Sequence, residues 1–132
     1  IIGFLIRQIG AFPVDRARMD AASMRTAITV LKDGKLLGMF PEGTRSTTGD
    51  LQAFRAGALR LAARTRVTVI PAAVWGTDRG LPPGKWIRPA RVGITFGAPI
   101  DMSALYDRND KGEALERTLT ELRDKIQAMQ TG

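Results

Sequence analysis

Apolar positions recur at helical spacing in three parts of this chain. Between Asp20 and Asp33 they fall three or four residues apart, which predicts an amphipathic helix ended by Gly34. The same spacing predicts a second helix over residues 51–64, with Gly57 inside it as a sign of close packing, and a last helix from about Glu113 to Met129. The last helix is expected to bury one stripe of side chains, namely Leu115, Leu119, Leu122, Ile126 and Met129.

Shorter apolar runs predict strands at residues 11–14, 35–40, 67–75 and 90–97. Residues 67–75 are continuously apolar, as in a strand buried on both faces, whereas residues 90–97 alternate and predict one polar face. The strand, helix and strand between residues 11 and 40 imply parallel strands joined by a right-handed crossover. We therefore predict an α/β fold with a mixed, largely parallel central sheet flanked by helices.

Several polar and charged side chains directly follow the predicted strand at residues 35–40. The chain passes through Pro41 into the carboxylate of Glu42, then Gly43, the hydroxyls of Thr44 and Ser46, and the guanidinium of Arg45. Open α/β sheets bind ligands at the carboxyl ends of their strands, and arginine offers a planar fork of donors to phosphate. The alternative is a solvated turn, which is what most such segments are.

A second predicted strand, residues 11–14, also ends in charged side chains. Asp15 and Arg16 follow it directly. If the two strands are parallel, both polar segments lie at one edge of the sheet and belong to one anion-binding site. The alternative for Asp15 and Arg16 is a surface ion pair worth less than about 1 kcal/mol.

Composition narrows the chemistry. The chain has 132 residues, enough for one domain with a core, and contains neither cysteine nor histidine. This excludes disulfides, thiolate metal sites and every Ser-His or Cys-His arrangement within these residues. The net charge of +7 suits nucleic acid, an anionic membrane surface or a phosphorylated substrate. The cations are scattered and aromatic residues make up only 6% of the chain, so nucleic acid is the least supported of these three partners.

The chain is expected to be a piece of a longer protein. It starts at Ile1, without an initiator methionine, in an apolar stretch that predicts the tail of a core helix stopped by Gly10, with a membrane-surface helix as the alternative. No run approaches the ~20 apolar residues of a membrane span.

Four segments, in order along the chain, resemble the signature blocks of the glycerolipid acyltransferases, and especially the 1-acylglycerol-3-phosphate (lysophosphatidic acid) acyltransferases. Residues 40–46, Phe-Pro-Glu-Gly-Thr-Arg-Ser, resemble the third block, and residues 10–16, which end in Asp-Arg, resemble the second. Residues 54–58 resemble the Phe-Lys-x-Gly segment, with Arg55 in place of lysine. Residues 69–73 resemble the fourth block, an apolar run with proline. The resemblance extends from Ile1 to about Gly97.

One departure concerns catalysis. The family's first block, Asn-His-x-Ser-x-x-Asp, supplies the histidine that acts as general base and the aspartate that orients it. This chain contains no histidine, so we expect that block upstream of Ile1 and expect no catalytic residue within the chain. Residues 1–132 are then the C-terminal larger part of a single acyltransferase domain, and the fragment alone is expected to be inactive.

The resemblance also implies roles for the remaining residues. Arg16 and Arg45 are expected to bind the acceptor's phosphate, while Glu42 and Gly43 shape the acceptor pocket and Glu42 holds an arginine or a glycerol hydroxyl. Arg55 is expected to add charge to the same pocket. Thr44 and Ser46 are further substrate-binding candidates, with turn capping as the alternative.

The implied function is transfer of a fatty acyl group from acyl-CoA or acyl-carrier protein to the free hydroxyl of a lysophosphatidic acid-like acceptor, in phospholipid biosynthesis. The expected location is the cytoplasmic face of a membrane, and neither a metal nor a bound cofactor is implied. The alternative from another class is a non-catalytic module that binds phospholipid or another anion.

Overall fold

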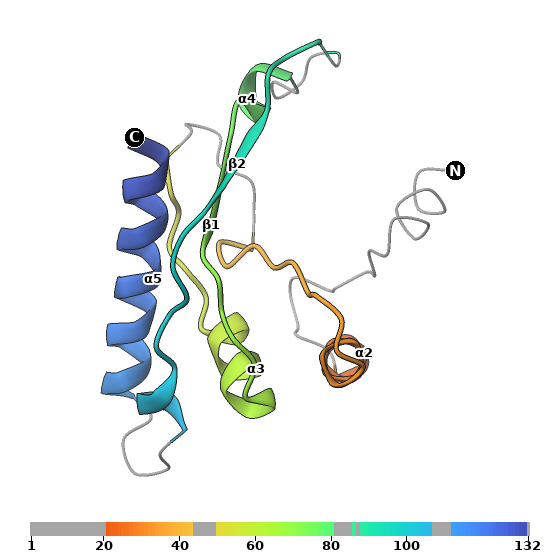
Figure 1. Cartoon of the computed structure of the whole chain (residues 1–132), viewed down its shortest axis with the longest axis vertical. Helices are drawn as coiled ribbons and strands as arrows, with labels where there is room; N and C mark the ends of the chain where they lie inside the picture. Colours follow the sequence, from red (N-terminus) through yellow and green to blue (C-terminus); the bar gives the residue numbers. More distant parts are fainter. Residues whose placement is uncertain (1–20, 44–49, 81–85, 87, 107–111, 132) are drawn as a thin grey trace. The chain divides into compact units, whose positions relative to one another are not determined.

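The structure is a computed structural model that describes residues 21–43, 50–80, 86, 88–106 and 112–131 (Figure 1). The chain divides into two compact units, residues 1–39 and residues 40–132, which are described separately below. The elements are α2 (Ala21–Lys32), α3 (Gly57–Thr65), β1 (Ala72–Trp75), α4 (Thr77–Gly80), β2 (Gly93–Phe96), the 3-10 turn η1 (Ser103–Leu105) and α5 (Glu113–Thr131).

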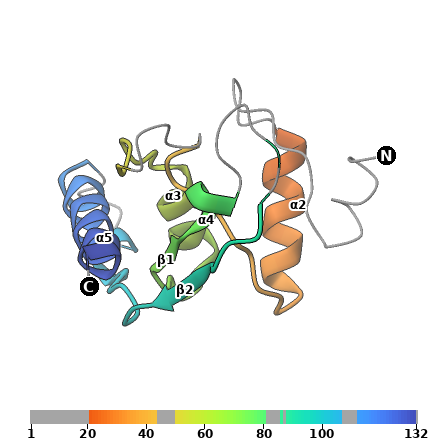
Figure 2. The same ribbon diagram turned by 90° about the horizontal axis from the view of Figure 1, so that it is seen from above.

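The second unit is built on an antiparallel pair formed by β1 and β2. Ala72 lies opposite Phe96 and Val74 opposite Ile94. The pairing continues beyond the strands, because the Gly97 amide donates to the Pro71 carbonyl at 2.9 Å and a bridge joins Val69 to Ile100. Proline is tolerated here because only its carbonyl is used. Helix α5 packs along this pair (Figures 1 and 2).

The core of this unit lies between α5, α3 and the strand pair. Its buried residues are Leu59, Ala62, Ala73, Ile100, Met102, Leu115, Leu119, Leu122 and Ile126. The predicted stripe of the last helix is confirmed, with Met129 partly buried at its end. The sequence pattern did not single out Thr118, which is buried on the same helix and donates its hydroxyl to the Ala114 carbonyl at 2.8 Å.

The prediction that residues 67–75 are buried on both faces is wrong for the described structure. Helix α5 lies against β1, but Ile70, Ile94 and Phe96 remain more than half exposed. Alternate residues of a strand point to opposite faces, so these side chains occupy the face that no described element of the second unit covers.

The fold class is confirmed at the level of an α/β chain with helices flanking strands. The pair that the structure describes is antiparallel, and parallel pairing stays a prediction. The expected strand at residues 11–14 and the expected helix at residues 1–10 lie outside the described residues.

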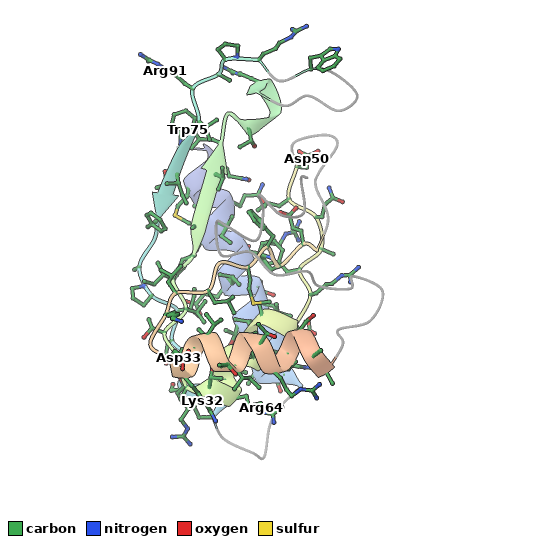
Figure 3. All side chains as sticks on the ribbon, turned by 90° about the vertical axis from the view of Figure 1, so that its right-hand side faces the viewer. Lys32, Asp33, Asp50, Arg64, Trp75 and Arg91 are labelled. Atoms are coloured by element: carbon green, nitrogen blue, oxygen red, sulfur yellow. The ribbon has the colours of Figure 1, made fainter. Side chains whose placement is uncertain are left out.

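The expected helix over residues 51–64 begins later than the apolar pattern indicated. Residues 51–55 are not helical, and α3 starts at Gly57. Gly57 therefore opens the helix instead of interrupting it, and the helix cost attached to an interior glycine does not apply. Leu59, Leu61 and Ala62 are the buried residues of α3, and Arg64 lies in its last turn (Figure 3).

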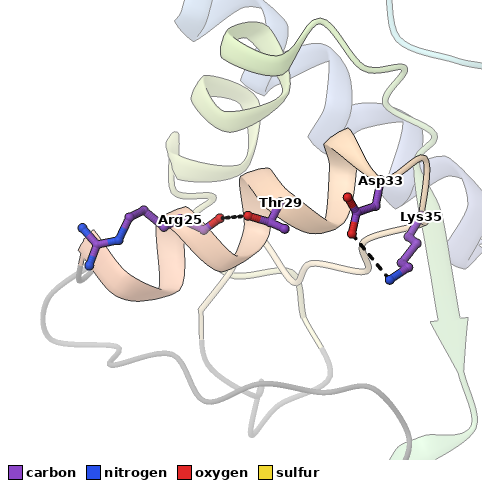
Figure 4. A network of polar contacts seen from close by, with 4 residues as sticks. All are labelled: Arg25, Thr29, Asp33 and Lys35. Atoms are coloured by element: carbon purple, nitrogen blue, oxygen red, sulfur yellow. Dashed lines mark hydrogen bonds and ion pairs between the residues drawn. The ribbon is translucent and has the colours of Figure 1, made fainter.

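In the first unit, α2 confirms the helix predicted between Asp20 and Asp33. Its end is a Schellman motif, in which the Lys35 amide donates to the Val30 carbonyl and the Gly34 amide donates to the Leu31 carbonyl, both at 3.1 Å. Gly34 takes the left-handed φ of +71° that this motif requires. An exposed ion pair between Lys35 and Asp33, 3.6 Å long, lies at the same end (Figure 4).

The prediction of a buried strand at residues 35–40 is wrong. None of these residues is in a strand, Leu36 is 90% exposed and Phe40 is 78% exposed. A strand needs a neighbour for its backbone amides and carbonyls, and no strand among the described residues pairs with this segment. An apolar run alone cannot specify that neighbour.

Candidate functional site

Three of the seven predicted binding residues fall within the described structure: Glu42, Gly43 and Arg55. The other four lie outside the described residues, namely Arg16, Thr44, Arg45 and Ser46. Glu42, Gly43 and Arg55 belong to the same compact unit, so their arrangement can be followed directly.

Residues 40–43 form a tight turn. The Gly43 amide donates to the Phe40 carbonyl at 3.1 Å, and Pro41 occupies the second position, where its fixed φ suits a turn. Gly43 has φ of +67°, a left-handed conformation that costs other residues free energy. Glycine at this position of the motif therefore has a backbone reason independent of any ligand.

Two hydrogen bonds tie this turn to residues 51–55. The Gln52 amide donates to Oε2 of Glu42 at 2.7 Å, and the Arg55 amide donates to the Pro41 carbonyl at 2.8 Å. The first bond is charge-assisted and partly buried, which places it among the stronger hydrogen bonds of a protein. In a helix starting at residue 51 the Arg55 amide would bond to the Leu51 carbonyl; here it bonds to Pro41 instead, and α3 begins only after Ala56.

Glu42 thus acts as a clamp between the turn and the segment that leads into α3. The sequence predicted that this carboxylate would hold an arginine or a glycerol hydroxyl, whereas the partner of its Oε2 is the backbone of Gln52. The signal was missed because a backbone amide is present at nearly every residue, so Gln52 carries no mark in the sequence that identifies it as the partner.

The Arg55 side chain passes directly beside Gly43. A Cβ atom on Gly43 would lie 3.1 Å from Nε, 3.3 Å from Cδ and 3.4 Å from Cζ of Arg55. Such contacts are at or below ordinary van der Waals separation, so the absence of a side chain at Gly43 lets the guanidinium lie against the turn. Arg55 is exposed to solvent, so its side chain lies at the surface of the motif.

The site therefore brings a cation, a carboxylate and a glycine turn together from two segments about ten residues apart. Gly43 is followed in the sequence by Thr44, Arg45 and Ser46, the predicted phosphate-binding arginine and hydroxyls, which lie outside the described residues. Such an arrangement suits an anionic ligand, because guanidinium groups bind phosphate through charge-assisted hydrogen bonds.

Metal chemistry has no support in the part of the chain that the structure describes. No group of three or more aspartate or glutamate side chains lies close enough together there to hold a metal ion. Within the same residues, no helix has the length and apolar character needed to cross a bilayer.

A family model and relatives of known name both match this chain to acyltransferases. A family model described as Acyltransferase matches residues 1–75, more than half of the chain. The 1-acyl-sn-glycerol-3-phosphate acyltransferase of Bacillus subtilis is 31% identical over 131 residues, covering 95% of this chain and 63% of the relative. The enzyme of the same name from Streptococcus pneumoniae is 36% identical over 115 residues, covering 85% of this chain and 40% of the relative.

A solved structure agrees with these relatives. The crystal structure of the 1-acyl-sn-glycerophosphate (LPA) acyltransferase, PlsC, from Thermotoga maritima matches with a TM-score of 0.64 and 29% identity, covering 83% of this chain and 44% of that one. The chain thus spans between two fifths and two thirds of these proteins. The match over residues 1–75, together with these relatives, shows that the chain belongs to the acyltransferase family.

Proposed function

We propose that the protein to which this chain belongs transfers a fatty acyl group from a thioester donor to the free hydroxyl of a lysophosphatidic acid-like acceptor. The proposal covers acyl-CoA and acyl-carrier protein as donors, phospholipid biosynthesis as the setting, and the cytoplasmic face of a membrane as the location. It is supported by family membership and by relatives that are named for this acceptor.

The observation that carries the proposal is the position of Arg55 against Gly43. It places a cation beside Gly43, within the segment that resembles the third signature block. We propose that Arg45 and Arg16 bind the acceptor's phosphate and that Arg55 adds charge to the same pocket. Thr44 and Ser46 supply hydroxyl donors to the phosphate oxygens.

In this proposal, Glu42 and Gly43 shape the pocket without touching the reacting atoms. Glu42 holds the turn against Gln52, and Gly43 leaves room for the Arg55 side chain. The general base and the aspartate that orients it are assigned to the first signature block, which these 132 residues do not contain. We also propose a largely parallel central sheet for the complete domain, supported by its family membership.

The test joins this chain to its native upstream segment and measures loss of the acyl-CoA thioester with lysophosphatidate as acceptor. Arg45→Ala and Arg55→Gln should each raise the acceptor KM by about tenfold, since a hydrogen bond to a charged group contributes about 1.5–3 kcal/mol. The KM for acyl-CoA should stay near the unchanged protein's value. Arg64→Gln, which removes an exposed arginine from the last turn of α3, is the matched control and should change neither KM.

Two results would count against the proposal. An unchanged acceptor KM in both Arg45→Ala and Arg55→Gln would refute the phosphate assignment. Absence of transfer by the joined protein, combined with retained binding of lysophosphatidate, would favour a non-catalytic anion-binding module instead.

A further inference from the structure

The end of the β1–β2 hairpin exposes large apolar side chains. Trp75, at the end of β1, is 48% exposed, and Trp86, in the connection to β2, is 92% exposed. Val92, just before β2, is also more than half exposed. Large apolar side chains exposed in one stretch of a chain are typical of an interaction site. Trp75 and Trp86 are the chain's two tryptophans.

The same end of the hairpin is cationic. Arg79, Arg88 and Arg91 are all exposed, and Figure 3 shows Arg91 beyond Trp75 at the end of the hairpin. Across residues 76–91 the sequence has four cations (Arg79, Lys85, Arg88 and Arg91) and one acidic residue (Asp78), a net charge of 4 − 1 = +3. We define the hairpin tip as the described members of this surface: Trp75, Arg79, Trp86, Arg88, Arg91 and Val92.

Local contacts hold the hairpin tip in place. The Arg88 amide donates to the Gly80 carbonyl at 2.9 Å, which joins the segment before β2 to the end of α4. The Trp75 ring lies across Gly93, where any Cβ atom would overlap it. Trp75 is therefore positioned by its own hairpin and still keeps about half of its surface exposed.

A hollow lies in this surface. Its volume is about 480 Å³, and its lining includes Trp75, Arg79 and Arg91. These three side chains are exposed, so they form an open surface. A small soluble ligand needs walls that bury most of its own surface, whereas Trp75, Arg79 and Arg91 in this lining are exposed to solvent. A broad anionic surface needs no such walls.

We propose that the hairpin tip docks on an anionic lipid surface. Tryptophan favours the headgroup level of a bilayer, where its ring is apolar and its N–H finds a partner, and arginine binds lipid phosphates while its aliphatic stem stays in contact with apolar groups. The three arginines match the negative charge of such a surface. The inference rests on the proposed function, because a lysolipid acceptor is presented at a membrane.

The two tryptophans report directly on this contact. Intrinsic fluorescence of the chain is measured with vesicles of phosphatidylcholine alone and with vesicles that also contain phosphatidylglycerol. A blue shift and quenching by brominated lipid are expected with the anionic vesicles, weakening as salt is added, because screening shortens the range of the attraction. No shift with anionic vesicles would overturn the proposal.

A matched pair of triple variants separates docking from general basicity. Arg79→Gln/Arg88→Gln/Arg91→Gln changes the hairpin tip, and Arg60→Gln/Arg117→Gln/Arg123→Gln removes the same charge from exposed positions on α3 and α5. The hairpin-tip triple should bind vesicles about a hundredfold more weakly, since each arginine near an anionic surface contributes about fivefold. The control triple should lose less than about fivefold, because its arginines lie away from the bilayer.

Further outcomes are decisive as well. Equal losses in the two triples would overturn the proposal, and so would a fluorescence shift with soluble phosphate or CoA that vesicles fail to produce. Trp86→Ala tests the apolar contribution if the hairpin-tip triple does not fold, and it should weaken binding at least tenfold, whereas unchanged binding refutes insertion of the ring.

The readout is independent of acyl transfer because the vesicles contain no lysolipid. Transfer to a short-chain, water-soluble lysophosphatidate by the chain joined to its upstream segment should be the same with and without the hairpin-tip substitutions. Failure of that transfer counts against the proposed function, and failure of vesicle binding counts against the docking surface.

Discussion

The clamp between Glu42 and Gln52 can be tested by removing the carboxylate. Glu42→Ala eliminates the 2.7 Å hydrogen bond from the Gln52 amide to Oε2. A hydrogen bond to a charged group contributes about 1.5–3 kcal/mol, and partial exposure of this one favours the lower end of that range. We therefore expect Glu42→Ala to lower the free energy of unfolding by about 1.5 kcal/mol.

The measurement is urea unfolding followed by far-UV circular dichroism. With a denaturant slope of about 1.5 kcal/mol per molar, the expected loss moves the midpoint down by about 1 M. Glu42→Gln keeps an uncharged acceptor oxygen at the same reach and should lose only about 0.5–1 kcal/mol, the difference between a charge-assisted and a neutral hydrogen bond.

The matched control is Glu121→Ala on α5. Glu121 forms an exposed ion pair with Lys125 at 2.8 Å, one helical turn away. Such pairs contribute about 0.3–0.5 kcal/mol, so the control should barely move the midpoint. If Glu42→Ala shifts the midpoint no more than Glu121→Ala does, the clamp is refuted. If Glu42→Ala leaves stability intact and instead raises the acceptor KM, the carboxylate binds substrate directly.

Three further predictions concern other residues. Gly43→Ala should cost about 1–2 kcal/mol of stability, because alanine is strained at the φ of +67° and its Cβ would push against Arg55; an unchanged urea midpoint would contradict this. Leu59→Ala, at a core position that is 1% exposed, should cost about 2–5 kcal/mol in the same assay, whereas Arg60→Ala on the exposed side of α3 should cost less than about 0.5 kcal/mol. Asp101 accepts a hydrogen bond from the Ser103 amide at 2.9 Å, which lowers the pKa of its carboxyl. The stabilisation is therefore present above the unfolded pKa and lost as pH falls through the folded one, so the difference in melting temperature between the unchanged chain and Asp101→Asn should shrink toward acidic pH. A difference in melting temperature that stays constant with pH would refute this role of the Asp101 carboxylate.

Local sequence determined the parts of this protein whose stabilising partners are close along the chain. Helix α2 follows from its apolar spacing and from Gly34, which closes its end within five residues. Helix α5 follows from a stripe of apolar side chains at the same spacing, and burial of that stripe confirmed it. The family followed from four ordered segments, because motif order needs no knowledge of contacts.

Tertiary structure decided the features that depend on a distant partner. Residues 35–40 have the apolar content of a strand, but strand formation requires a neighbouring backbone that the local pattern does not specify. The predicted helix start at residue 51 is replaced by a start at Gly57, because the Arg55 amide bonds to the Pro41 carbonyl instead of to a helical carbonyl. The residues of the candidate site stay a prediction from the motif, whereas the geometry of Glu42, Gly43 and Arg55 depends on a backbone hydrogen bond that leaves no mark in the sequence.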